Sequence, residues 1–381
     1  MIWYILTFAM PLIQFGVSWW VNVASVGSVA GILKLHNFPS NLANQSRNTL
    51  LAVVGMFVAY LWQSFGDFHS FLRVSREALI LILMGYVSSR KIPPGGPNLI
   101  RKYKKMLLVV SLFQLALTSF QFVLLQRGRW FGPPEIWFAG RGGLIPTNLD
   151  LVYSYIRPSG TFSEPSFLGI FCLAIIVISI PRLDKERILR FVFLANAITI
   201  LLSQSKSAIF FLFILLIYVF KSFRKYLVQK IPFYFLGGIG LVFLIYNQII
   251  TRIQSASSSE VSIDNRIFSP IKFVLKSITD NPLGTDFYGR VYDVLDLNSG
   301  LSWETILHNA IYNLIFSYGL FGIVVLVVIF SMFRGIFELR VYLLAVLLQN
   351  GSFLDFDKLF LLLVTSVMYQ QMRNMKDEQK T

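Results

Sequence analysis

The sequence predicts an all-α fold: one integral membrane domain over residues 1–381, built as a bundle of about eleven transmembrane helices, in a range of about ten to twelve. Two observations lead to this prediction. Hydrophobic residues make up 55% of the chain and charged residues 14%, at a mean hydropathy of +0.64, far from the composition of a soluble domain. Apolar stretches near the ~20 residues that cross a bilayer also recur along the whole chain.

Several of these stretches are long enough to approach one crossing each: residues 5–32, 49–66, 71–88, 106–125, 165–181, 232–250 and 308–333. Two others consist of two short apolar halves around a polar centre. One is 188–220 around residues 203–207, and the other is 339–371 around residues 351–358. The stretch 5–32 could cross the membrane once or form a tight hairpin around Gly16. The predicted number of spans is therefore given as a range.

The distribution of charge predicts the topology. The net charge of +15 comes from basic residues that cluster in alternate loops, as the positive-inside rule expects. The loops assigned to the cytoplasm hold 21 Lys and Arg in 68 residues, whereas the two long loops assigned outside, about 126–163 and 251–307, hold 9 in 95. The basic loops are therefore explained by topology and contacts with membrane lipids, and no nucleic-acid partner is expected.

The single cysteine and the amino terminus indicate which covalent and targeting features the protein is expected to have. The one cysteine, Cys172, lies in an apolar span, so the sequence predicts no disulfide framework and no thiolate metal cluster. The start of the chain is apolar, without a basic n-region or a small-residue cleavage site, which predicts a retained span rather than a signal peptide.

The first candidate site is the turn-rich segment of residues 157–166, which borders a long apolar run. Pro165 suits the first position of a helix, which leaves Glu164 or Ser163 as the cap and puts the carboxylate at the positive end of the helix dipole. Arg157 is close enough in sequence to fold back over the same helix start. The structural interpretation is an Arg-Glu pair that pins a loop, and the functional one is a cation for an anionic substrate beside a carboxylate.

The second candidate is Lys206, with Ser205 among the hydroxyl-bearing neighbours that surround it at a break between two apolar halves. Loop parity places this cation away from the cytoplasm, so the positive-inside tendency does not explain it. It is either a lysine that snorkels to the interface or a phosphate contact at a broken helix.

The larger outer loop holds the other two candidates. Asn265 and Arg266 follow Asp264, and the arginine fork suits bidentate phosphate binding, although a surface ion pair with Asp264 is the structural alternative. Beyond them, Glu304, His308 and Tyr312 fall on one face if the segment is helical, so that the carboxylate orients the imidazole. Asn309 lies beside this histidine, which has a structural interpretation as well.

No metal or cofactor site is predicted. The segment Asp355-Phe356-Asp357 resembles the Asp-x-Asp metal clamp of nucleotide-sugar transferases, but loop parity places it outside, where nucleotide sugars are absent. The sequence also contains no Walker loop, no His-Glu-x-x-His, no Gly-x-Ser-x-Gly and no zinc-type Cys/His spacing.

Taken in order, the four segments resemble the O-antigen polymerase and O-antigen ligase family, the Wzy-like membrane proteins of bacterial envelope glycan assembly. Residues 157–165 resemble its segment at the outer start of a helix, and residues 205–208 its Ser-Arg-Gly/Ser-Ala junction, although Lys206 stands where arginine is typical. Residues 265–266 and 281–284 resemble the start of its large loop, and residues 308–322 its close.

This resemblance implies a GT-C-like fold and transfer of a glycan from undecaprenyl pyrophosphate to a hydroxyl of a lipid-linked repeat unit, outside the bacterial inner membrane. Arg157, Arg266 and Lys206 would then meet the charge of the pyrophosphate without a metal. Glu164 or His308 would orient or deprotonate the acceptor, with inversion at the anomeric carbon. The substrate-binding residues expected from the same segments are Lys206, Ser205, Asn265, Asn309, Tyr312 and Glu304.

The resemblance implies partners and leaves alternatives. The partners are an undecaprenyl-pyrophosphate-linked oligosaccharide, membrane lipids and a chain-length regulator protein. The form Glu164-Pro165 favours a polymerase over an O-antigen ligase, which more often has asparagine there. A transporter of polysaccharide or lipid-linked oligosaccharide is the alternative of a different class, because it would also be all-helical and broken at residues 203–207.

Overall fold

The computed structural model describes residues 23–40, 43–132, 157–162, 164–227, 269–285, 309–348 and 354–375. Within these residues the secondary structure consists of twelve α-helices, one 3-10 turn and an isolated bridge between Ser40 and Arg90. The all-α prediction is therefore confirmed for the described part of the chain. The predicted single domain and the number of spans stay predictions.

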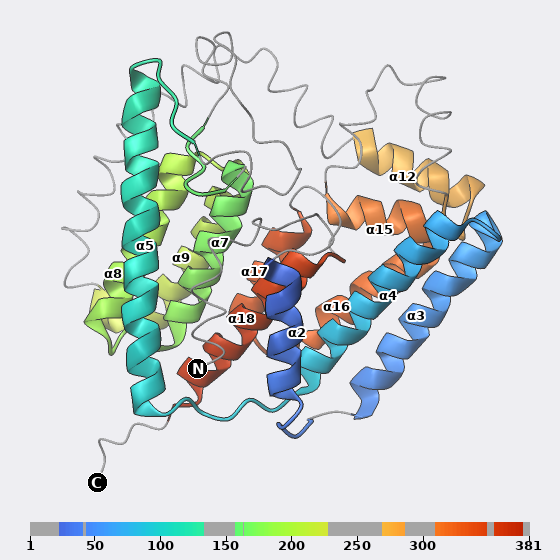
Figure 1. Ribbon diagram of the computed structural model, residues 1–381, viewed down its shortest axis with the longest axis horizontal. Helices are drawn as coiled ribbons and strands as arrows, with labels where there is room; N and C mark the ends of the chain where they lie inside the picture. The colour runs from blue at the N-terminus through green and yellow to red at the C-terminus, as the bar shows by residue number, and fades with distance from the viewer. Residues whose placement is uncertain are drawn as a thin grey trace.

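The helices form a bundle with two sides and a middle (Figure 1). One side holds α5 (Pro97–Gln126), α7 (Pro165–Ser179), α8 (Arg187–Ser203) and α9 (Lys206–Leu227). The other side holds α3 (Ala43–Ser64), α4 (Phe68–Ser89), α12 (Ser269–Asp280), α15 (Ala310–Tyr318) and α16 (Leu320–Met332). Between them lie α2 (Val23–Leu35), α17 (Phe337–Leu347) and α18 (Phe356–Arg373), of which α18 packs against both α7 and α4.

Both predicted polar breaks separate two helices. The first lies between α8 and α9, where Gln204 takes a left-handed conformation at φ 53° and ends α8. The second lies between α17 and α18, which begins at Phe356. Pro165 is the first residue of α7 and Glu164 its N-cap, as the sequence predicts.

The apolar stretch 308–333 differs from the single span that the sequence predicts, because it contains two helices. α15 ends at Gly319, whose φ of 54° suits glycine, and α16 begins at the next residue. A Cβ at Gly319 would collide with the carbonyl oxygen of Pro282, and Leu320 N donates to that oxygen at 2.9 Å. The segment 281–285 therefore packs into the break, which brings together two segments far apart in the sequence.

The loops that follow α2, α4 and α18 meet at one end of the bundle. Lys91 N donates to Pro39 O at 2.8 Å, and Asn374 Nδ2 donates to Ile92 O at 3.4 Å. We call this end the basic end, because Arg90, Lys91 and Arg373 lie here. Basic residues at this end are what the positive-inside rule expects of the cytoplasmic side.

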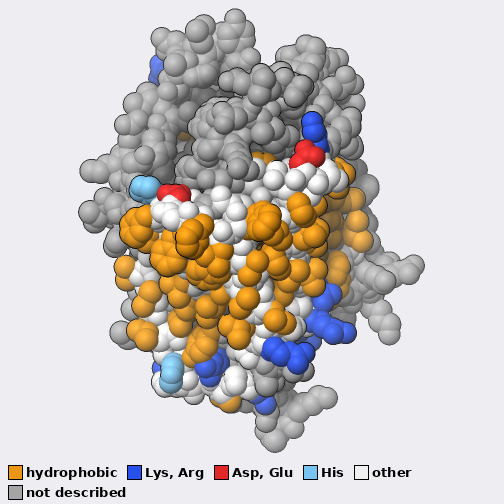
Figure 2. All heavy atoms as spheres, turned by 90° about the vertical axis from the view of Figure 1, so that its right-hand side faces the viewer, with side chains coloured by type: hydrophobic (Ala, Val, Ile, Leu, Met, Phe, Trp, Pro, Cys, Tyr) orange, Lys and Arg blue, Asp and Glu red, His pale blue; other side chains and the backbone are white. Residues whose placement is uncertain are grey.

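Between the two ends, apolar side chains face outward. Two described segments, α5 and Pro165–Arg182, are long and apolar enough to cross a membrane, judged by length and composition. Figure 2 shows a band of hydrophobic side chains across the side that holds α3 and α4, with Lys and Arg side chains below it. Large apolar side chains exposed on α3 include Leu50, Leu51, Val54, Leu61 and Trp62. Such a band suits a lipid environment.

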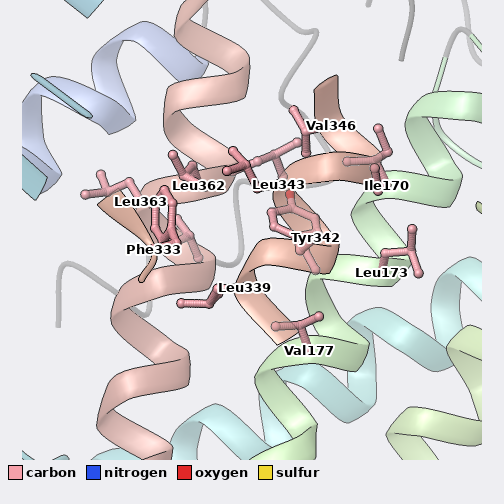
Figure 3. Close-up of a cluster of buried hydrophobic side chains, with 14 of the residues drawn as sticks. Ile170, Leu173, Val177, Phe333, Leu339, Tyr342, Leu343, Val346, Leu362 and Leu363 are labelled. Carbon is pink, nitrogen blue, oxygen red and sulfur yellow. The ribbon is translucent and has the colours of Figure 1, made fainter. Parts of the chain in front are cut away.

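The core is formed in part where α7, α17 and α18 meet (Figure 3). Side chains from all three helices interdigitate there, and α7 is buried along nearly its whole length. Because lipid is as apolar as these side chains, close packing rather than expulsion of water holds such helices together. The start of α7 therefore has a well-defined position. The labelled buried residues are Ile170, Leu173, Val177, Phe333, Leu339, Tyr342, Leu343, Val346, Leu362 and Leu363.

The orientation of the bundle can be tested by labelling of introduced cysteines, because the native Cys172 is buried. His69 is exposed near the start of α4, and Arg334 is exposed after α16. We expect a membrane-impermeant maleimide to label His69→Cys, but not Arg334→Cys, in intact spheroplasts, and to label both after permeabilisation. The native chain should stay unlabelled. Labelling of Arg334→Cys in intact spheroplasts would contradict this orientation.

Candidate functional site

Three parallel helices begin side by side at the end opposite the basic end. The start of α9 lies against α7, because a Cβ at Gly169 would come within 3.2 Å of Ser205 Oγ. The start of α18 also lies against α7, since Lys358 Nζ sits 4.7 Å from the centroid of the Phe167 ring. The N-terminal ends of three helix dipoles are therefore neighbours, and such ends favour anions.

The far ends of α7 and α18 confirm that these two helices are parallel. Arg182 Nη1, in the turn that follows α7, donates to the carbonyl oxygen of Met375 at 3.4 Å, just beyond the end of α18. Arg182 is buried at the basic end. The two helices thus keep the same direction and the same neighbours from one end of the bundle to the other.

Glu164 precedes the first turn of α7, but its carboxylate forms no hydrogen bond with the helix amides. Its backbone is extended at φ −134°, and its side chain makes no capping hydrogen bond. One carboxylate oxygen accepts from Ser166 Oγ at 3.0 Å, and the residue is half-buried. Because the carboxylate does not cap α7, the positive end of this helix is not neutralised by a hydrogen-bonded anion of its own N-cap residue.

Arg157 reaches the break between α8 and α9. Its Nη1 donates to the carbonyl oxygen of Gln204 at 3.2 Å, two residues before Lys206. Lys206 is exposed as the first residue of α9, whereas Ser205 is buried. The structure thus brings Arg157, Ser205 and Lys206 together at the break, next to the first turns of α7. The two predicted cations, Arg157 and Lys206, therefore belong to a single candidate site.

The other predicted residues have different positions. Asn309 is the N-cap of α15, and its Oδ1 accepts from Tyr312 N at 2.9 Å, which is a structural role. The shared face predicted for Glu304, His308 and Tyr312 required one helix through Asn309, but Asn309 is extended at φ −126° and α15 begins at Ala310. The remaining candidates lie outside the described residues: Asn265, Arg266, Glu304 and His308.

A buried network of charged residues between α4 and α18 was not predicted as a site. Arg76 pairs with Asp355 at 3.3 Å, so Asp355 belongs to an ion pair that joins the two helices. Burial and the neighbouring Asp357 raise the pKa of Asp355, which precedes α18, to about 6. Asp357 and Lys358, in the first turn of α18, are themselves buried. No group of three or more His, Cys, Asp or Glu that could hold a metal ion occurs among the described residues.

The same network extends along α4. Arg73 pairs with Glu77 at 3.1 Å, and Arg73 Nη2 donates to Ser317 Oγ at 3.2 Å. The hydroxyl of Tyr318 donates to the other carboxylate oxygen of Glu77. A sequence signal for this network exists, because Arg73, Arg76 and Glu77 interrupt an apolar stretch, and charges inside membrane spans are functional candidates by default.

Comparison with known families provides one match. A family model described as WcaD colanic acid polymerase matches residues 2–371. A search of curated proteins found no match.

Loss of Glu77 should destabilise the fold, because the carboxylate is 1% exposed and has two partners, Arg73 and Tyr318. We expect Glu77→Ala to lower the free energy of unfolding by about 3 kcal/mol, the cost of leaving a buried charge without its partner. The control is Glu186→Ala, whose pair with Lys104 spans 2.9 Å near the basic end. This control should cost less than about 1 kcal/mol. Equal shifts in the thermal midpoint of the detergent-purified variants would contradict this prediction.

Proposed function

We propose a reaction for this chain from one premise: it belongs to the WcaD colanic acid polymerase family, whose model covers nearly its whole length. It is therefore a Wzy-like polysaccharide polymerase, a membrane glycosyltransferase that joins lipid-linked repeat units. The match to a polymerase family favours this activity over the two alternatives, an O-antigen ligase and a transporter. Membrane lipids and a chain-length regulator protein stay predicted partners.

The proposed reaction transfers the growing glycan from undecaprenyl pyrophosphate to a hydroxyl of an incoming lipid-linked repeat unit of the colanic acid type. The bond between the anomeric carbon and the phosphate oxygen breaks, and a bond to the acceptor oxygen forms in a single displacement with inversion. Undecaprenyl pyrophosphate leaves, and the acceptor proton passes to a base of the protein. We place the reaction on the extracytoplasmic side, because the basic end carries the charge expected for the cytoplasm.

The observation that carries this proposal is the convergence of three helix starts with basic side chains. The first turns of α7, α9 and α18 lie side by side, and Arg157, Lys206 and Lys358 belong to these turns or contact them. A pyrophosphate leaving group gains negative charge as the anomeric bond breaks, and fixed donors that face this charge lower the barrier. Helix starts at a broken-helix junction provide such donors without any rearrangement.

The acceptor sugar is proposed to bind beside Glu164, the N-cap residue of α7. Glu164 is half-buried beside the same helix starts, and Ser166 holds its carboxylate at 3.0 Å. A carboxylate in this place is suited to orient or deprotonate a sugar hydroxyl. His308 is the second proposed base and Arg266 a further proposed cation, and both lie outside the described residues. Asn265, Glu304, Asn309 and Tyr312 stay proposed contacts for sugar or phosphate.

Arg157→Ala should reduce transfer by on the order of a hundredfold, because one charge-stabilising donor is lost from the transition state. Cells that carry the variant should accumulate single repeat units on the lipid carrier or final acceptor, seen on an envelope gel. The control is Arg129→Ala, since Arg129 is exposed in the loop after α5 and belongs to no proposed site. Wild-type chain lengths from Arg157→Ala, at a membrane level equal to that of the control, would exclude the proposed role.

The proposed use of protein cations in place of a metal predicts that chelation has no effect on transfer. Purified protein and defined lipid-linked repeat units should elongate glycan at the same rate with and without EDTA. The assay should include a metal-dependent glycosyltransferase as a positive control for chelation. A loss of elongation that divalent ions restore would show that a metal takes part in the reaction.

A further inference from the structure

Gln121 on α5 binds the backbone of the segment that follows Arg157. Its side-chain oxygen accepts from Ser159 N at 3.0 Å and from Gly160 N at 2.8 Å. Its side-chain nitrogen donates to Gly160 O at 2.9 Å. One amide side chain thus satisfies three backbone groups of a segment that lies outside any helix.

Gln114, two turns earlier on α5, binds the next residue of the segment. Its nitrogen donates to Thr161 Oγ1 at 2.8 Å, and its oxygen accepts from Thr161 N at 3.4 Å. The close approach of Gln114 requires glycine at the neighbouring position, because a Cβ at Gly160 would collide with the Gln114 oxygen. Gly160 also has a φ of 60°, which glycine adopts without strain.

Both glutamines are fully buried, and they lie on one face of a helix that is long and apolar enough to cross the membrane. From Gln121 to Gln114 the helix descends about 10 Å, and Gln114 lies about 18 Å from the end of α5 that is opposite the basic end. Backbone outside a helix is tolerated at such depth only where protein groups replace water. At residues 159–161 these two side chains supply partners for the three backbone N–H groups, for Gly160 O and for the Thr161 hydroxyl.

We propose that Gln121 and Gln114 are positioning residues, which clamp residues 159–161 and so hold Arg157 at the break between α8 and α9. This inference rests on the proposed function of Arg157. The arginine is two residues from the first clamped amide, so a shift of the segment moves its guanidinium away from Gln204 O, which it contacts at 3.2 Å. A cation that stabilises a developing charge loses most of its effect when it is displaced by about 1 Å.

The experiment compares Gln121→Leu with Gln126→Leu, because Gln126 is exposed at the end of the same helix. Purified variants are assayed with defined lipid-linked repeat units for turnover and for the apparent KM. Gln121→Leu should reduce turnover roughly tenfold, with little change in the apparent KM, since the displaced cation acts mainly on the transition state. Gln126→Leu should behave like the native chain.

A second variant addresses the case in which Gln121→Leu fails to fold. Gln121→Glu keeps the shape of the side chain and an oxygen that accepts from Ser159 N and Gly160 N, so the fold should persist. When it is ionised, this glutamate cannot donate to Gly160 O. We therefore expect a smaller loss of turnover than in Gln121→Leu. Native turnover in a folded Gln121→Leu would overturn the inference, and so would native turnover in Gln121→Glu if Gln121→Leu does not fold.

A double-mutant cycle distinguishes positioning from general damage. If Gln121 acts through Arg157, Gln121→Leu should cause little further loss of turnover in the Arg157→Ala background. Two independent effects would instead give a further tenfold loss of turnover. Losses that multiply fully in the double variant would overturn the inference while leaving the role of Arg157 intact. Native activity of Arg157→Ala alone would instead overturn the proposed function itself, so the two failures give different results.

Discussion

The packing of α7 against α9 and α18 is the interaction on which the rest of the site depends. All three helices begin at the same end, so their positive dipole ends add in one place rather than cancel. The close contact at Gly169 and the position of Lys358 over Phe167 determine how near these ends come to one another. The core shared by α7, α17 and α18 then gives the start of α7 a fixed position (Figure 3).

Polar groups between the helices obey a second constraint, because lipid supplies no hydrogen bonds. The protein meets it in two ways. Charged side chains pair across helices, as Arg76 of α4 does with Asp355, which precedes α18. Backbone amides of Ser159 and Gly160, which lie outside any helix, donate to the side chain of Gln121 on a neighbouring helix. Both arrangements connect separate helices, so they also determine how those helices are placed relative to one another.

These two constraints connect fold and activity. In the proposed reaction, the polymerase binds a diphosphate at the membrane surface while the polyprenyl tail stays in lipid. The helix starts would form the proposed diphosphate site, and the clamped segment would hold the proposed arginine without a flexible tether. The charged network between α4 and α18 lies one helix further along the same end, and Lys358 connects it to α7.

Local features of the chain were enough to predict the all-α class, the alternation of basic loops, the start of α7 at Pro165 and the break before Lys206, because helix caps and hydrophobic length are local properties. Short motifs in the sequence were also enough to recognise a resemblance to the Wzy-like family, and the family match confirms this resemblance. Three features follow instead from long-range packing: Arg157 contacts the break beside Lys206, α15 and α16 are separate helices, and Gln121 binds Gly160. These facts depend on contacts between segments tens of residues or more apart, and hydrophobic periodicity within one segment carries no information about which other segment will pack against it.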